Sequence, residues 1–569
     1  MDNSEIVDIL ELTGRLLELH DADAFRVRAY QTAAFNLDKT TEHLAQLSAA
    51  DLIKLPGVGK MVAGKIREIV ETGRLQDLDE LLARTPEGVL EMFRIKGLGV
   101  KKIKTIWQEV GIDNPRDLKI ACENGQIAQI KGFGEKMQEK ILQSLEFMQS
   151  QSGKVRMDRA EALANVLRDE LLKRFARVEI SGQVRRQAQE VDTLQLLIET
   201  PDPVAAQRDL AELSFLTQNE ALSSPFAWRG ELQGSDVLVE LLLYPKNQID
   251  QRLFIHTATE SHLVQPGSSG QTLLQVALTQ PVATEEEIYS RAGLPYIVPE
   301  MRENARAFDW AARHSNDELV TWEDLRGILH NHSTWSDGKH TVEQMALHCR
   351  ELGFDYFGIA DHSQTANYAK GLDENRVRQQ QEEIDRLNAQ FSPSFRIFKG
   401  TESDILSDGS LDFDEETLAS FDYVVASVHQ NLNMSLEKAT TRLLRAIENP
   451  HTTILGHPTG RLLLAREGYP IDHRAIIDAC AEHQVVIEIN ASPYRLDIDW
   501  RWIDYAMERG VMLSINPDAH EMAGLLDMRY GLAVGRKGGL TKNMTFNTLS
   551  LGEMETYLQD RKRKLSKEV

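Results

Sequence analysis

Hydrophobic positions recur with helical spacing in the first part of this chain, and as short strand-like runs in its last part. Between residues 325 and 545, seven apolar runs each end in His, Asp, Glu or Asn. They are RGILHNHS, DYFGIADHS, FRIFKGTESDI, DYVVASVH, TTILGHP, VVIEINAS and VMLSINPDAH. Helical stretches such as TVEQMALHCRELG separate most of them. This alternation predicts a distorted seven-stranded parallel α/β barrel, with its site at the rim where the strands end.

The first 150 residues repeat one short motif between helical stretches. The copies LPGVGKMVAGKI, IKGLGVKKIKTI and IKGFGEKMQEKI begin at Leu55, Ile95 and Ile130. Each copy places two glycines before a helix that contains lysine, at the following positions: Gly57 and Gly59, Gly97 and Gly99, and Gly132 and Gly134. Glycine allows a tight turn, and the first amides of the next helix suit a phosphate oxygen. The motif resembles the helix-hairpin-helix, which binds the DNA backbone without reading sequence.

Length and charge narrow the class of protein. With 569 residues the chain is too long for one core, and three to four domains are expected. The net charge is −23, but residues 1–150 carry only −4 of it, from 20 Lys and Arg against 24 Asp and Glu. DNA binding would therefore depend on local backbone and lysine contacts. Three scattered cysteines without a CxxC indicate a reducing cytoplasm, and no apolar run is long enough to span a membrane.

Residues 21–34, which precede the first glycine motif, also resemble part of a known family. DADAFRVRAYQTAA, at residues 21–34, resembles the start of the small N-terminal domain of family X DNA polymerases. In that family, a lysine on the helix after the first hairpin can form a Schiff base with an abasic sugar. Lys65 occupies that position, so the resemblance implies a lyase role for it. An ordinary surface lysine is the alternative.

Residues 155–245 resemble the nucleotidyltransferase palm of family X, but the catalytic positions differ. RFARVEISGQVRRQAQEVDTLQLLIET reads as strand, turn and strand, and its Gly182, Arg185 and Arg186 match the family frame. The family places a serine and three aspartates where this chain has, in order, Gln183, Thr193, Gln195 and Glu240. Two neutral residues and one glutamate leave too little negative charge for two Mg²⁺ beside a triphosphate.

The segment that resembles the nucleotide-binding part of the family has changed as well. In FIHTATESHLVQ, Thr257 and His262 remain, whereas residues 258–260 and 263 depart from the family pattern. EEEIYSRAGLPYIVPEMRE, at residues 285–303, still matches the closing segment of the family. We therefore expect the polymerase scaffold to persist without its activity, as a degenerate palm followed by a thumb-like region.

The segments HNHSTWSDG, ADHS, GTESDI, SVH, GHPTGR and PDAH resemble the PHP (polymerase and histidinol phosphatase) domain, which follows the polymerase core in bacterial family X enzymes. Eleven of the 16 histidines lie between residues 330 and 520. The resemblance implies three divalent metals, Mn²⁺ or Zn²⁺. It assigns His330, His332, Glu402 and Asp518 to the first, Glu402, His429 and His457 to the second, and Asp337, His362 and His520 to the third.

Two further positions near these ligands affect the predicted site. Arg461 in HPTGRLL is a candidate phosphate clamp, with a salt bridge at the rim as its alternative. Ile328 stands where the family commonly has an aspartate, which removes a carboxylate near the ligands. The reaction that the resemblance implies is two-metal hydrolysis of a phosphodiester.

Together these patterns predict a multidomain DNA-repair enzyme. We expect an all-α hairpin region over residues 1–150, an α+β palm over 155–245, a thumb-like region over 246–310 and a PHP barrel over 322–569. The predicted activity is a metal-dependent 3′–5′ exonuclease, with AP endonuclease as an addition. The alternatives are an active gap-filling polymerase that uses Glu240 and Asp192, and a phosphatase of small molecules. The predicted partner is gapped, nicked or abasic DNA with 3′ ends, bound by a cytoplasmic, nucleoid-associated monomer.

Overall fold

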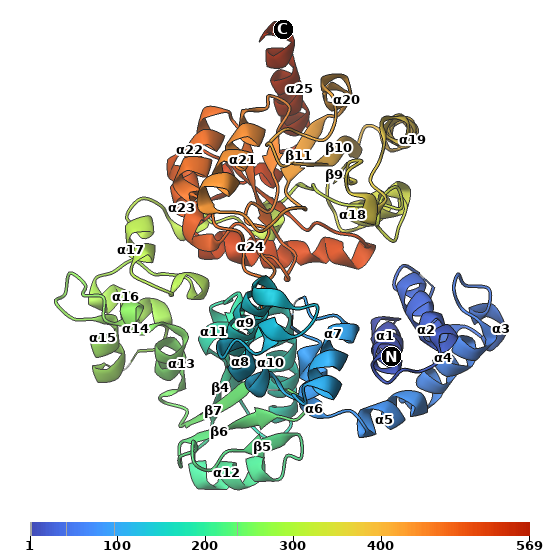
Figure 1. The fold of residues 1–569 in the computed structure, drawn as a ribbon. Helices are drawn as coiled ribbons and strands as arrows, with labels where there is room; N and C mark the ends of the chain where they lie inside the picture. Colours follow the sequence, from blue (N-terminus) through green and yellow to red (C-terminus); the bar gives the residue numbers. More distant parts are fainter. Residues whose placement is uncertain (1–2, 41, 96, 236, 281, 569) are drawn as a thin grey trace. The chain divides into compact units, whose positions relative to one another are not determined.

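The computed structural model describes residues 3–40, 42–95, 97–235, 237–280 and 282–568, and is drawn in Figure 1. The chain divides into two compact units, Met1–Ser152 and Gly153–Val569. The first unit has its own buried core, and the second contains several. The finer boundaries expected at residues 155, 246 and 322 stay a prediction. Among the described helices, none combines the length and hydropathy that crossing a bilayer requires.

The first unit is built from short helices over its described residues. These are α1 (Asn3–Leu19), α2 (Ala24–Leu37), α3 (Ala49–Leu52), α4 (Lys60–Thr72), α5 (Gln76–Ala83), α6 (Glu87–Met92), α7 (Val100–Lys104), α8 (Pro115–Glu123) and α9 (Gly134–Gln151). Apolar residues at helical spacing, such as Ile6, Leu10 and Leu17 of α1, are buried in its core. Helices α1 and α2 pack along each other and set the frame for α4 and α5.

The second unit begins with a five-stranded sheet in the order β2-β4-β7-β6-β5. Its strands are β2 (Val178–Ile180), β4 (Thr193–Glu199), β5 (Leu216–Gln218), β6 (Ala227–Leu232) and β7 (Leu238–Tyr244). Strands β4 and β7 run parallel, and the other pairs are antiparallel. Helices α10 (Met157–Leu171) and α12 (Pro203–Ala211) pack against this sheet. Beside it, β1 (Val155–Arg156) pairs with β3 (Glu190–Val191), and α11 (Gly182–Arg185) forms the turn before β4.

Helices follow the sheet and lead to the barrel. They are α13 (Ile249–Thr257), α14 (Glu260–Leu263), α15 (Leu273–Thr279), α16 (Glu285–Ala292) and α17 (Arg306–Ala311). Their core contains the large side chains Phe254, Tyr289 and Trp310. Trp310 also donates a hydrogen bond from Nε1 to the carbonyl oxygen of Gly539 at 2.9 Å. This buried contact attaches the helical region to the barrel that follows.

A nearly closed parallel barrel forms the last part, as predicted. Its strands are β8 (Gly327–Ile328), β9 (Tyr356–Ile359), β10 (Arg396–Asp404), β11 (Tyr423–Ser427), β12 (Ile454–Leu455), β13 (Val486–Asn490) and β14 (Leu513–Asn516). They follow one another in sheet order, and each of the seven predicted runs contains one of them. A parallel bridge from Asn331 to Ala519 joins the first strand end to the last. The connections are therefore the expected strand–helix crossovers.

Helices cover the outside of these strands (Figure 1). They are α18 (Val342–Glu351), α19 (Glu374–Phe391), α20 (Glu415–Ser420), α21 (Leu436–Glu448), α22 (His473–Glu482), α23 (Ile503–Glu508) and α24 (Met528–Lys537), whereas α25 (Leu551–Glu568) packs Met554 and Leu558 against the core that contains Tyr423 and Val486. Inside, the ring of Tyr423 needs the space left by Gly358 and Gly400, where an added Cβ would lie 2.4 Å from its atoms. Its hydroxyl donates to the carbonyl oxygen of Ile359 at 2.8 Å. The barrel interior is thus a packed core and not a channel.

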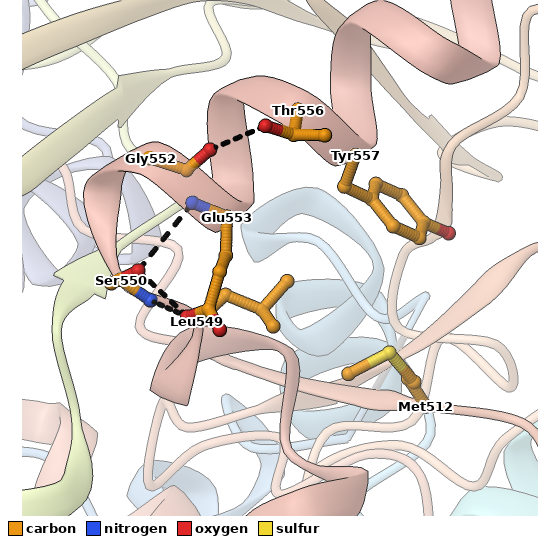
Figure 2. A pocket seen from close by; sticks show the side chains of 7 residues that line it. All are labelled: Met512, Leu549, Ser550, Gly552, Glu553, Thr556 and Tyr557. Carbon is orange, nitrogen blue, oxygen red and sulfur yellow. Dashed lines mark hydrogen bonds between the residues drawn. The ribbon is translucent and has the colours of Figure 1, made fainter.

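A mainly apolar pocket lies where α25 meets the barrel (Figure 2). Its lining includes Met512, Leu549 and Tyr557, together with the first turn of α25. Met512 precedes β14, whereas the predicted ligands Asp518 and His520 follow it. The pocket is therefore at the opposite end of the strand from the predicted chemistry.

Candidate functional site

The predicted metal ligands all lie at the carboxyl ends of the barrel strands. Glu402 is in β10, and the others stand in the segments that follow strands, as this series shows: His330, His332 and Asp337 after β8, His362 after β9, His429 after β11, His457 after β12, and Asp518 and His520 after β14. Parallel strands bring these ends to one rim, so residues almost 200 positions apart in the sequence become neighbours.

Three of these residues hold a backbone conformation that side chains rarely adopt. His330, His457 and Asp518 have positive φ angles of 57°, 22° and 54°. Such a conformation costs about 1–3 kcal/mol for a residue other than glycine, and it persists only where the surroundings enforce it. The sequence places no glycine at these positions, so the strained backbone serves to direct the side chains into the rim.

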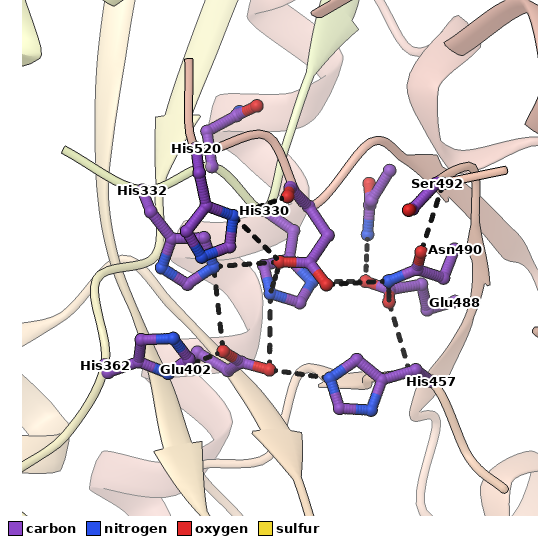
Figure 3. A network of polar contacts seen from close by, with 12 residues as sticks. His330, His332, His362, Glu402, His457, Glu488, Asn490, Ser492 and His520 are labelled. Atoms are coloured by element: carbon purple, nitrogen blue, oxygen red, sulfur yellow. Dashed lines mark hydrogen bonds and ion pairs between the residues drawn. The ribbon is translucent and has the colours of Figure 1, made fainter. Parts of the chain in front are cut away.

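The carboxylate of Glu402 is the centre of the cluster (Figure 3). Its Oε1 lies 2.9 Å from Nε2 of His457 and 3.2 Å from Nε2 of His429. Its Oε2 lies 2.9 Å from Nδ1 of His362. The side chain of Glu402 is 1% exposed, so this negative charge is balanced by the surrounding histidines and not by water.

Eight of the nine predicted ligands fall into three groups whose donor atoms lie within 4.8 Å of one another. The groups are His332, Asp337, His362 and His520; His330, His332 and Asp518; and His362, Glu402 and His429. His332 and His362 thus each belong to two groups, which differs from the predicted allocation of one metal each. His457 approaches the cluster through Glu402.

Electrostatics within the cluster are strongly coupled. Burial alone would neutralise Glu402, but the charges of His429 and His330 outweigh burial and hold its pKa well below the ordinary value. His332 behaves in the opposite way, because burial and the neighbouring His520 and His362 lower its pKa to about 3. The centre therefore combines an ionised carboxylate with a neutral imidazole, the protonation states in which both bind cations.

Several buried atoms at the centre have no hydrogen-bond partner among the described residues. They are Nε2 of His330 and Nδ1 of His332 and His457, and also Nδ1 of His362 and Oε2 of Glu402, which lie 2.9 Å apart without the geometry of a hydrogen bond. Buried polar atoms are almost always paired, so a cluster of unpaired lone pairs indicates a missing ligand. Imidazole nitrogens and carboxylate oxygens together fit a divalent cation, and we conclude that the barrel is a divalent-metal site.

A second tier of carboxylates, which the sequence analysis missed, orients the predicted ligands. Glu488 in β13 accepts from Nδ1 of His330 at 2.6 Å and from the backbone amide of His457 at 3.1 Å. Asp404 in β10 lies 2.5 Å from Nδ1 of His429. Both side chains are buried. An acidic residue inside a buried strand, as in VVIEINAS, is the signal that would have revealed them.

Other predicted positions lie outside this cluster. Arg461 donates to the carbonyl oxygens of Arg495 and Leu496 and pairs with Asp499 at 3.0 Å, so its donors are engaged within the barrel. The remaining histidines between residues 330 and 520, at positions 340, 348, 451, 473 and 483, also lie outside the three groups of ligands. Ile328 is a fully buried residue of β8.

At the palm positions where the sequence differs from the family pattern, the polar groups satisfy one another. Gln195 and Glu240 stand opposite each other on β4 and β7, and Gln195 donates from Nε2 to Glu240 Oε2 at 2.5 Å. Arg229 on β6 pairs with the same carboxylate at 2.6 Å. Gln183 accepts from the amides of Asp192 and Thr193 at 3.0 and 3.3 Å, so it caps the start of β4.

The two arginines of the palm frame are engaged by the closing segment. Arg185 pairs with Glu285 at 2.6 Å, and Arg186 pairs with Glu303 at 3.2 Å. His262, the retained residue of the altered nucleotide segment, is fully buried and lies 2.8 Å from the hydroxyl of Tyr289. These contacts explain why the scaffold keeps its fold although the catalytic positions differ.

The hairpin glycines adopt the geometry that the motif predicts. Gly57, Gly97 and Gly132 have φ angles of 77°, 89° and 93°, in the region that glycine favours. Gly59 and Gly99 stand directly before α4 and α7, whereas in the third copy Gly134 begins α9 itself. Five of the six glycines face open space: no atom lies within 4 Å of a Cβ added at Gly59, Gly97, Gly99, Gly132 or Gly134. A ligand can therefore approach the protein backbone closely at these turns.

Lys65 on α4 lies in a surface hollow with Phe25, Met61 and Asp77. Its ammonium group pairs with Glu68 at 3.0 Å and with Asp77 at 3.1 Å. Burial opposes the charge, but these two carboxylates outweigh it and raise the pKa of Lys65 above the ordinary value. At neutral pH the amine is therefore protonated.

Replacing Glu488 with glutamine should weaken metal binding, because the amide no longer supports His330 and the backbone of His457 as a charged acceptor. We expect Glu488→Gln to lower Mn²⁺ affinity about 10–100-fold, as measured by calorimetric titration. Glu343→Gln, on the exposed side of α18, is the matched control and should bind like the wild type. Equal affinity in Glu488→Gln would show that this carboxylate does not support the centre.

The architecture agrees with known families over most of the chain. Residues 1–75 match a helix-hairpin-helix domain, residues 89–146 a SAM-like helix-hairpin-helix tandem, and residues 329–492 a PHP domain. A probable phosphatase of Thermoanaerobacter sp. (strain X514) is 31% identical over 182 residues, which are 30% of this chain and 71% of the relative. A probable phosphatase of Acetivibrio thermocellus is 25% identical over 42% of this chain and 96% of its own length.

A similarity along the whole chain decides the family. The DNA polymerase/3'-5' exonuclease PolX of Bacillus subtilis (strain 168) is 33% identical over 98% of this chain and 100% of its own length. Hairpin domains, a five-stranded sheet and a barrel that matches the PHP domain occur here in the same chain, in that order. This chain therefore belongs to the PolX family, in which a family X polymerase core is followed by a PHP domain.

Proposed function

We propose that this protein is a DNA-repair nuclease whose PHP barrel removes nucleotides from 3′ ends and also cuts at abasic sites. The observation that carries the proposal is the buried cluster around Glu402, with its unpaired imidazole and carboxylate atoms. The name of the Bacillus subtilis relative includes a 3'-5' exonuclease, which supports the same activity here. The hairpin turns, with glycines open to solvent, would hold the backbone of gapped, nicked or abasic DNA.

We assign three divalent ions, Mn²⁺ or Zn²⁺, to the nine predicted ligands. Mixed histidine and carboxylate donors suit these ions better than Mg²⁺, which prefers oxygen ligands alone. When bound, such ions supply Lewis acidity to the phosphoryl oxygens. The chain itself keeps the ligand rings in place through Glu488 and Asp404 and shields the centre from bulk water. All nine residues come from one chain, which supports activity as a monomer.

The activity can be tested with DNA labelled at the 3′ or the 5′ end, digested in the presence of Mn²⁺. We expect the wild type to release the 3′ label first, and His332→Ala to be at least about 100-fold slower because His332 belongs to two ligand groups. His483→Ala, an exposed histidine at the end of α22, is the control and should keep full activity.

Equal degradation by wild type and His332→Ala would show that the barrel is not the nuclease. If the protein releases phosphate from p-nitrophenyl phosphate but leaves DNA uncut, the alternative of a small-molecule phosphatase is favoured. The names of the shorter relatives, probable phosphatases, are the observation that keeps this alternative open. The hairpin domains count against it, since a small-molecule enzyme has no use for them.

We also propose that the palm no longer polymerises DNA. The carboxylate of Glu240 is already paired with Arg229 and hydrogen-bonded by Gln195, so a metal would have to displace both. Thr193 contributes a neutral hydroxyl that donates to Asp192 at 2.9 Å. Two Mg²⁺ beside a triphosphate need several carboxylates, and this site supplies one that is already neutralised.

Primer extension on a gapped duplex tests this loss. The His332→Ala variant should be used, so that exonuclease activity cannot remove an added nucleotide. We expect no template-dependent extension with Mg²⁺ or Mn²⁺, and a lower melting temperature for Glu240→Ala because Arg229 loses its partner. Robust templated extension that Glu240→Ala abolishes would instead support a gap-filling polymerase with a rearranged site.

We also propose a lyase role for Lys65, and its surroundings make this role dependent on pH. The two carboxylates that raise its pKa keep the amine protonated, and only the neutral amine forms a Schiff base. As long as the pH is below that pKa, each unit by which the pH rises should increase the rate of Schiff-base formation about tenfold. Borohydride trapping on DNA with a 5′ abasic sugar should therefore give more product at about pH 9 than at about pH 7. Lys65→Ala should abolish trapping and Lys60→Ala should not; equal trapping in all three proteins would assign the amine elsewhere.

A further inference from the structure

The segment after β13, residues 491–499, forms part of the rim of the metal centre. Asn490 directly precedes this segment, and its Nδ2 donates to Glu488 at 2.9 Å and to Asp518 at 3.1 Å. Its Oδ1 accepts from the amide of Ser492 (Figure 3). Asp497 closes the loop by accepting from the amide and hydroxyl of Thr459, both at 2.9 Å. The loop is therefore tied to the centre at both of its ends.

This loop carries Arg495 to the edge of the cluster. Its Nε lies 3.5 Å from Oδ2 of Asp518, and among the described residues no other lysine or arginine nitrogen comes within 4 Å of a predicted ligand carboxylate. The side chain is 19% exposed, yet within the described chain its guanidinium donates no hydrogen bond. A guanidinium has five N–H donors, and leaving them unused beside an acidic centre favours an external acceptor.

A second arginine, Arg466, belongs to a neighbouring loop, in which the amide of Leu463 donates to the carbonyl oxygen of Tyr494 at 2.7 Å. Arg466 donates to the carbonyl oxygen of Gly460 at 2.6 Å and forms no ion pair within the described residues. Burial, and next the positive charge of Arg495, lower the pKa of Arg466. Arg466 therefore adds positive charge to the surroundings of Arg495, which favours an anionic ligand there.

The palm contributes to the position of this loop. Gln189, which precedes β3, donates from Nε2 to the carbonyl oxygen of Leu496 at 3.1 Å. The guanidinium of Arg156 in β1 lies 3.7 Å from the centre of the Tyr494 ring. Leu496 itself has a positive φ of 45°, so this backbone needs external support to keep its shape. Arg461 supplies part of that support from the barrel, and the palm supplies the rest.

We propose that Arg495 binds the phosphate of the DNA strand at the metal centre, and that the palm residue Gln189 positions Arg495 for this task. The inference rests on the proposed nuclease function and deepens it. It moves phosphate recognition from Arg461 to Arg495 and gives the degenerate palm a role in hydrolysis. Arg495 is then a substrate-binding residue, and Gln189 is a positioning residue that acts through the loop.

The test uses the full-length protein with Mn²⁺ and 3′-labelled DNA. We expect Arg495→Ala to lower kcat/KM about 10–100-fold, mainly through KM, while the metal content and melting temperature stay unchanged. Arg495→Lys should recover part of the loss, because it restores charge but not bidentate geometry. Gln189→Ala should cause a smaller loss of the same kind. Arg501→Ala, whose side chain is 61% exposed and pairs with Asp499, is the matched control without effect.

Salt dependence separates phosphate binding from a structural role. Losing one phosphate contact should reduce the slope of log kcat/KM against log salt concentration by about one in Arg495→Ala. An unchanged kcat/KM and slope would overturn the proposal, and so would a loss of bound metal in Arg495→Ala, since Arg495 would then act on Asp518.

A second measurement covers the case in which the wild type does not cut DNA, which would contradict the proposed function alone. Inorganic phosphate should then still raise the melting temperature of the Mn²⁺-loaded wild type, and the rise should be smaller in Arg495→Ala. An equal rise, or none, in both proteins would overturn the assignment of the phosphate site.

Discussion

The structure of the barrel depends on one buried charge, the carboxylate of Glu402. An ionised carboxylate without water costs several kcal/mol unless opposite charges and donors surround it. Histidines from the ends of β9, β11 and β12 meet this requirement, and each must reach the same point from a different strand. His330, His457 and Asp518 adopt a strained backbone because their side chains must also point into this cluster. Glu488 and Asp404, one tier further out, then hold the rings that Glu402 gathers.

The palm shows the opposite solution to a similar problem. At the barrel rim, buried lone pairs have no partner within the described chain, and a cation is needed to complete them. Between β4, β6 and β7, by contrast, Gln195, Arg229 and Glu240 complete one another without any external group. Two centres built on strands of the same chain are thus distinguished by whether their polar atoms are satisfied. This difference in pairing, more than the residue types alone, distinguishes the metal-type centre of the barrel from the site between β4, β6 and β7.

The palm also contacts the neighbouring barrel directly. Gln189 and Arg156 contact the loop that carries Arg495, and Lys537 of α24 donates to the carbonyl oxygen of Arg186 at 2.9 Å. Burial lowers the pKa of Lys537 to about 8, although Glu303 opposes the shift. Such buried polar contacts fix one relative arrangement of palm and barrel, since each loses its partner if the two separate. They give a physical reason for the palm frame to persist.

The sequence by itself determined the features that depend on local pattern. Seven strand ends with metal-type side chains, three glycine turns before helices and the altered positions Gln183, Thr193 and Gln195 could all be recognised from spacing and residue type. Tertiary structure alone decided which ligands share a group, that Glu488 and Asp404 support them, and that Arg495, not Arg461, keeps its donors unused. These outcomes depend on loop backbones such as that of Leu496 and on side-chain directions set by contacts between distant segments. Spacing along the chain carries no information about such contacts, because the energy of each is decided by packing partners far away in the sequence.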